Sequence, residues 1–116
     1  MMDYADFKTG PASRVFAGLG GEWASLLERS HSFGGLRHAV VSRNNEAHGC
    51  FVMAVRAYAG KASQGEHSLL LAICVLVDFG HVADKLSELL LTWQNIVRGC
   101  DRETRAAIAA CIEAAP

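Results

Sequence analysis

The chain has 116 residues, of which 51% are hydrophobic and 20% charged, and its formal net charge is −1 at pH 7. This composition predicts a single globular domain over residues 1–116 and argues against intrinsic disorder. The near-zero charge gives no overall field that would draw nucleic acid or an anionic membrane to the protein. Residues 1–62 carry seven basic and five acidic side chains, whereas residues 63–116 carry four basic and seven acidic ones.

The N-terminus, the longest apolar run and the cysteines together predict a soluble, cytoplasmic protein. The first residues are acidic and lack the apolar core of a secretory signal. The longest apolar run covers only residues 69–77, whereas a membrane-spanning helix needs about 20 residues. The four cysteines include no Cys-x-x-Cys pair, so we interpret them as free structural thiols.

The first third of the chain predicts short helices separated by glycine and serine. Pro11 suits the first turn of a helix that runs to about Ala17. Residues 22–31 have the spacing of a second short helix, and residues 32–35 are predicted to form a loop. A group of glycines would end the first helix (Gly18, Gly20 and Gly21).

Two structures remain open for residues 36–57. The alanines of this region favour helix, whereas its valines and Phe51 favour strand. The alternative to an all-α fold is therefore an α+β fold with a hairpin at about residues 36–57. In that fold, Asn44 and Asn45 would form the turn. We favour helix because alanine is a poor strand residue.

Residues 63–98 are the most informative stretch of the sequence. Ser63 and Glu66 fit a capping box, and the helix that they would start continues to about Phe79. Its centre is apolar on every side, which predicts a buried helix. A single helix over this whole stretch would be about 50 Å long, too long for a small domain, so we expect a break or bend at Gly80.

The C-terminal residues predict one more helix. Asp101 has the side chain of a good N-cap, and the residues after it are rich in alanine. The sequence as a whole therefore predicts an all-α fold, a compact single-domain bundle of five or six helices.

Asp78, His81 and Asp84 could bind a divalent transition metal. On a continuous helix their side chains would lie within a sector of about 120°. A complete site would need further ligands from another helix, which the sequence lacks, or from a second copy of the chain. The favoured interpretation is a solvated polar stripe, so we expect no cofactor.

His48 and Cys50 resemble a nucleophile and its base. Catalysis by a thiol requires a lowered pKa and a base within reach, and it usually needs a third group that orients the base. On a helix the two side chains would diverge, and on a strand they would form a dyad without that third group. We therefore favour a structural role for Cys50.

Residues 93–112 have the outline of a helix-turn-helix DNA reader. Three arginines cluster near the start of its second helix, but residues 106–112 offer no polar side chain that could read base edges. Nucleic-acid binding is therefore not expected.

The sequence contains no complete catalytic constellation, and large apolar side chains occur along its whole length. We therefore predict a non-enzymatic helical interaction module that docks on another protein or on its own copy. Phage and mobile-element inhibitors, such as anti-CRISPR proteins, and small adaptors of larger complexes share this size and class, without any sequence match. The candidate partner-binding residues are four acidic and three basic side chains (Glu66, Asp78, Asp84, Glu88, Arg98, Arg102 and Arg105). The alternative is a homodimeric metal-dependent or thiol enzyme that uses one of the two sets above (Asp78, His81 and Asp84, or His48 and Cys50).

Overall fold

The chain folds into nine helices and no strand within residues 2–87 and 93–116, the part that the computed structural model describes. The all-α prediction is confirmed, although these helices are shorter and more numerous than the predicted five or six. The helices in chain order are α1 (Tyr4–Thr9), α2 (Pro11–Leu19), α3 (Gly21–Arg29), α4 (Phe33–Glu46), α5 (Cys50–Ala59), α6 (Gln64–Leu76), α7 (Gly80–Leu86), α8 (Trp93–Gly99) and α9 (Arg102–Ala114).

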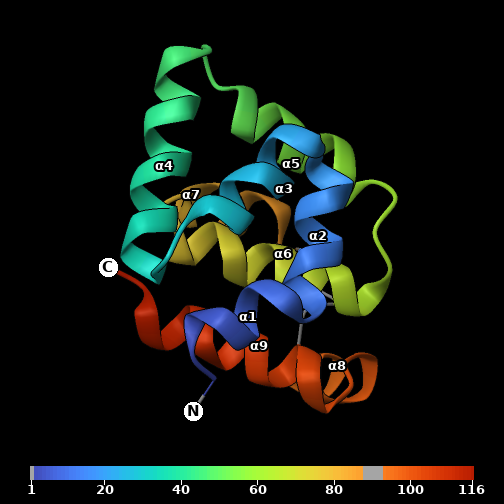
Figure 1. Cartoon of the computed structure of the whole chain (residues 1–116). Coiled ribbons are helices and arrows are strands. Elements are labelled where there is room, and N and C mark those ends of the chain that lie inside the picture. Colours follow the sequence, from blue (N-terminus) through green and yellow to red (C-terminus); the bar gives the residue numbers. More distant parts are fainter. Residues whose placement is uncertain (1, 88–92) are drawn as a thin grey trace.

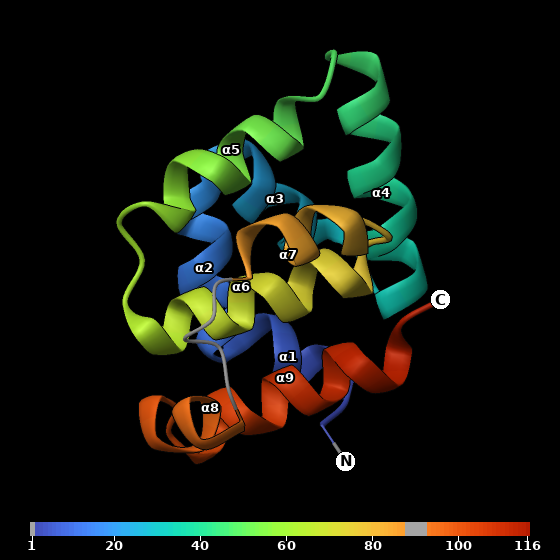
Figure 2. The ribbon, with the colours of Figure 1, turned by 180° about the vertical axis from the view of Figure 1, so that it is seen from behind.

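Helix α6 occupies the centre of the molecule. It runs across the middle of the view with α9 below it and α2 beside it (Figure 1). From behind, α7 covers another side of α6, while α5 lies above it (Figure 2). Residues 68–74 are all buried, which confirms the prediction that the apolar run forms an internal helix.

Both ends of α6 follow from the local sequence. At its start the Ser63 hydroxyl accepts a hydrogen bond from the Glu66 N–H, and the Glu66 carboxylate accepts one from the Ser63 N–H, as the predicted capping box requires. The helix ends at Leu76, and α7 begins at Gly80. The break predicted near Gly80 is therefore confirmed, and the chain turns through Asp78, whose φ of 69° lies in the left-handed region.

The hairpin alternative at residues 36–57 is wrong, because α4 and α5 fill this region. The predicted loop at residues 32–35 is wrong as well. The Ser32 hydroxyl accepts a hydrogen bond from the Gly35 N–H at 3.0 Å, so this serine caps α4 and the two glycines lie in its first turn. One turn further, Leu36 and Val40 both face the core and are fully buried.

Helix α1 was not predicted, and tertiary contacts hold it in place. Asp3 caps its start, accepting a hydrogen bond from the Asp6 N–H at 2.8 Å. Phe7 is fully buried, and the Tyr4 hydroxyl donates to the carbonyl of Leu27 in α3 at 2.8 Å. A six-residue helix is too short to be stable alone, so these contacts explain why sequence periodicity did not identify it.

Candidate functional site: the surface of α8 and the start of α9

Helix α8 exposes two large apolar side chains on one side. Trp93 is 76% exposed and Val97 is 53% exposed. The two are four residues apart in the helix, so they are neighbours on its surface. Ile96, on an adjacent face, packs partly against the core. Trp93 is one of the large apolar side chains that occur along the whole sequence, and it lies outside the core.

The C-terminal end of α8 is seated closely on the start of α6. A Cβ atom added to Gly65 would lie only 2.7 Å from the carbonyl oxygen of Gly99, closer than a Cβ carbon can approach. Cys100, directly after α8, is buried beside Gly65. Backbone contact therefore fixes one end of α8, and Trp93 projects from the other end.

Three exposed arginines lie in the chain directly after Val97: Arg98 near the end of α8, and Arg102 and Arg105 at the start of α9. Within the described residues, the ion pairs that form are those of Arg43 with Glu22 and Glu46. No described carboxylate forms an ion pair with these three arginines.

Asp101 sets the start of α9, as its sequence predicts. Its carboxylate accepts a hydrogen bond from the Thr104 N–H at 2.8 Å, and this bond lowers the pKa of Asp101. The carboxylate is thus directed at the first turn of α9. The two helices of the predicted helix-turn-helix outline are present, as α8 and α9. Figures 1 and 2 show them side by side at one lower corner of the molecule.

Two of the predicted acidic residues, Glu66 and Asp78, lie near opposite ends of α6. Both carboxylate oxygens of Glu66 accept hydrogen bonds within the chain, one from the Ser63 N–H and one from the Tyr58 hydroxyl. Asp78 and Asp84 are exposed, but Asp78 follows the opposite end of α6 from Glu66. A helix of 13 residues separates those ends by about 18 Å. Glu88 lies outside the described residues.

The structure does not bring together the candidate metal ligands Asp78, His81 and Asp84. Asp78 precedes α7 and has a left-handed backbone, whereas His81 and Asp84 lie within α7. The shared face was inferred for a continuous helix, which the turn at residues 77–79 interrupts. In the described part of the chain, no three His, Cys, Asp or Glu side chains are grouped to hold a metal ion.

His48 and Cys50 lie at the tight turn between α4 and α5. His48 has φ 54° and Gly49 has φ 84°, so the chain reverses direction through two left-handed residues. The Cys50 thiol is 3.7 Å from the carbonyl oxygen of Arg43, to which it donates. The thiol proton is therefore directed at the main chain of α4 and not at the imidazole of His48.

The other three cysteines are buried, and all four are free, as predicted. Burial raises the pKa of Cys74 to about 12 and also raises the pKa of Cys100 and of Cys111. A raised thiol pKa keeps the protonated, unreactive form at neutral pH. These residues therefore act as small apolar groups of the core.

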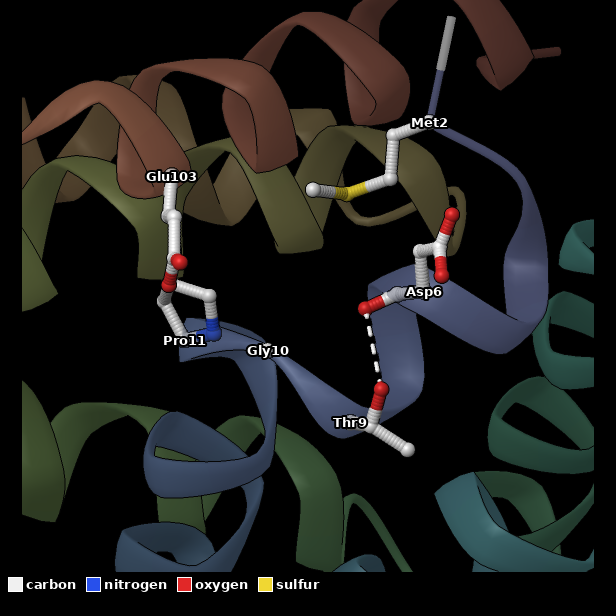
Figure 3. A pocket seen from close by; sticks show the side chains of 6 residues that line it. All are labelled: Met2, Asp6, Thr9, Gly10, Pro11 and Glu103. Atoms are coloured by element: carbon white, nitrogen blue, oxygen red, sulfur yellow. Dashed lines mark hydrogen bonds between the residues drawn. The ribbon is translucent and has the colours of Figure 1, made fainter.

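A shallow hollow of about 410 Å³ lies where the junction of α1 and α2 meets the start of α9. Figure 3 shows Asp6 and Glu103 on opposite sides of this hollow, with the Thr9 hydroxyl directed at the main chain of Asp6. The two carboxylates do not converge on one point, as a catalytic pair would have to do. Sequence reasoning missed this hollow because its residues are nearly one hundred positions apart in the chain.

Comparison of the chain with protein-family models, with curated proteins and with solved structures finds no match. In residues 2–87 and 93–116, no helix combines the length and the apolar character that crossing a bilayer requires.

Proposed function

We propose that this protein is a non-enzymatic interaction module that docks on another protein through α8 and the start of α9. The observation that carries the proposal is the 76% exposure of Trp93 on a helix whose other end is fixed against α6. Tryptophan and arginine are the residue types that most often dominate the binding energy of protein interfaces.

The surface is also preformed, which favours binding. Val97 adds apolar area directly beside Trp93, and the exposed Arg98 lies near the C-terminal end of the same helix. Because Gly65 and Gly99 hold α8 in backbone contact with α6, little conformational entropy would be lost when a partner covers this helix. The partner's identity would distinguish an inhibitor from an adaptor of a larger complex.

The test is a cross-linked pull-down from the native cell or its host with three forms of the tagged protein. These are the wild type, Trp93→Ser and the control Met53→Ser. Met53 is 69% exposed on α5, at the opposite end of the molecule from α8 (Figures 1 and 2). We expect one protein to be enriched by the wild type and by the Met53 variant, and to be lost with the Trp93 variant.

Equal enrichment of the partner by all three forms would show that α8 does not contribute to the interface. Recovery of the bait alone would count against the module. Sedimentation would then show whether the chain pairs with its own copy, and metal analysis of that species would test the homodimeric-enzyme alternative. A stoichiometric metal in a dimer, lost on Asp78→Asn or His81→Ala, would support the enzyme instead.

A further inference from the structure

We propose that the partner presents an acidic surface with an apolar centre to α8 and the start of α9. This inference rests on the proposed function and names the chemistry of the partner. It is carried by the three exposed arginines of residues 98–105 and by the hydrogen bond that directs Asp101 at the first turn of α9.

None of the three arginines forms an ion pair with a described carboxylate, although the charge of Arg105 adds to the Thr104 hydrogen bonds in lowering the pKa of Asp101. Arg98, Arg102 and Arg105 occupy one stretch of eight residues and all three are exposed. The described ion pairs involve only Arg43. A neutral surface that covered the exposed guanidinium groups would remove their hydrogen bonds to water and supply no charged acceptor in exchange. Carboxylates would instead bind these groups through charge-assisted hydrogen bonds.

The acidic side chains of the same stretch do not cancel these charges. Asp101 is directed at the first turn of α9, where it accepts the hydrogen bond of the Thr104 N–H. Glu103 is exposed but lines the hollow on the α1 side of α9. Residues 98–105 hold three arginines against these two carboxylates, so the stretch keeps a net positive charge, and an acidic partner has the complementary charge.

The apolar centre distinguishes a protein partner from a nucleic acid. Trp93 could stack on a base, but Val97 beside it offers only an aliphatic surface, which an apolar protein side chain covers better. We therefore assign the surface to an acidic protein segment and use nucleic acid as one arm of the test.

The test is a selection from a phage-displayed library of randomised helical peptides of about 18 residues, or five turns. Selection on the wild type is followed by counter-selection on Trp93→Ser. We expect enriched peptides to combine an apolar stripe with several Asp or Glu residues. Enrichment of neutral or basic peptides, or of none, would overturn the inference.

The enriched peptide is then measured by fluorescence anisotropy against two charge-neutralised variants. The first is R98Q/R102Q/R105Q, and the second is the matched control R29Q/R56Q/K61Q, which removes the same charge from exposed positions on other elements. We expect Kd to rise at least about tenfold for the first and less than about twofold for the control. An equal rise in Kd for the two variants would show that binding depends on the net charge of the protein alone, and it would overturn the inference.

Single-stranded oligo-dT and duplex DNA form the third arm. Binding of either one that is lost in R98Q/R102Q/R105Q and retained in the control would assign the surface to nucleic acid and overturn the acidic-protein inference.

The pull-down distinguishes failure of the acidic-partner inference from failure of the proposed function. A native partner lost with Trp93→Ser but retained by the arginine variant keeps the module and removes the acidic chemistry.

Discussion

Asn44 in α4 accepts a hydrogen bond through its Oδ1 atom from the backbone N–H of Phe51 in α5, at 3.0 Å. The same oxygen lies 3.4 Å from the N–H nitrogen of Val52. Helix α5 begins after Gly49, which has no side chain to cap it. The buried Asn44 therefore provides, from the preceding helix, the acceptor that an N-cap residue normally supplies.

Replacing this asparagine should destabilise the protein. We expect Asn44→Ala to lower the free energy of unfolding by about 1–3 kcal/mol, because two N–H groups at the start of α5 lose their acceptor. Urea denaturation followed by circular dichroism measures the change. Asn45→Ala, at the exposed neighbouring position, is the control, and equal losses for both variants would contradict the capping role.

Arg37 links the ends of two helices to α4. Its Nε donates to the carbonyl of Leu76 at 2.8 Å, and its terminal nitrogen donates to the carbonyl of Ala114. These are the last residues of α6 and α9, where free carbonyls and the helix dipoles attract a cation.

We expect Arg37→Ala to lower the free energy of unfolding by about 1–3 kcal/mol, since both helix ends lose a charged donor. Arg37→Lys should restore only part of the loss, because one ammonium group lacks the fork that reaches both carbonyls. Arg56→Ala, on the exposed side of α5, is the comparison in the same urea titration. Full rescue by lysine would show that charge alone is required.

Two glycines should respond in opposite directions to the same substitution. A Cβ on Gly18 would lie 2.2 Å from the ring of Tyr58, whereas nothing lies within 4 Å of one on Gly34. The Tyr58 ring cannot easily move, because it is buried and its hydroxyl donates to Glu66.

Gly18→Ala should therefore cost about 1–3 kcal/mol through forced repacking. Gly34→Ala should stabilise the protein by about 0.5 kcal/mol through higher helix propensity in α4. Melting temperatures of the two variants provide the measurement. A neutral Gly18→Ala would mean that the Tyr58 ring can leave its site at little cost.

Glu66 should make the stability fall in acid. Hydrogen bonds from Ser63, and then from the Tyr58 hydroxyl, lower the pKa of this carboxyl. The folded state then binds its proton less readily than the unfolded chain does. This contribution is complete above the unfolded value of about 4.3 and is lost as the pH falls through the folded pKa.

The free energy of unfolding of Glu66→Gln should therefore approach that of the wild type as the pH falls from about 6 to about 3. Urea titrations at several pH values test this. A constant difference between the two proteins over that range would show that the charge of Glu66 adds nothing.

Cys74 should make the stability fall in alkali. Burial raises its thiol pKa to about 12, so the folded protein holds a proton that the unfolded chain releases near pH 8.5, an approximate value for a free thiol. Its contribution is present below that unfolded value and is lost as the pH rises towards 12.

We compare the change in stability of the wild type and of Cys74→Ala between about pH 8 and about pH 11, in the presence of a reductant. The free energy of unfolding should fall further for the wild type, because only in the wild type does ionisation of this thiol stabilise the unfolded state. Parallel losses in the two proteins would assign the alkaline sensitivity to other groups, such as Tyr4 and Tyr58, whose pKa values burial raises to about 12.

Local signals in the sequence predicted the elements whose ends are capped by nearby residues. The capping box of Ser63 and Glu66 and the N-cap at Asp101 were identified correctly, because each involves groups only three residues apart. The run at residues 69–77 correctly indicated a buried segment. Hydrophobicity and capping are local properties, so one sequence is sufficient to reveal them.

The errors came from segments whose local residue types fit more than one structure. In the hairpin alternative Asn44 formed a turn, whereas it lies in α4 and its side chain caps the next helix. Ser32 was placed in a loop, although it caps α4. Asp78 and His81 would share a face only on a continuous helix, and the turn after α6 separates them.

Periodicity and composition were sufficient to favour the all-α class and to predict the buried central helix. Which apolar side chains remain exposed depends instead on how the helices pack against one another. Trp23 and Trp93 both stand at apolar positions of helical patterns, yet Trp23 packs against Phe51 in the core and Trp93 faces outward. The difference arises because the close contact of Gly65 with Gly99 fixes how α8 lies on α6, and no local pattern encodes that contact.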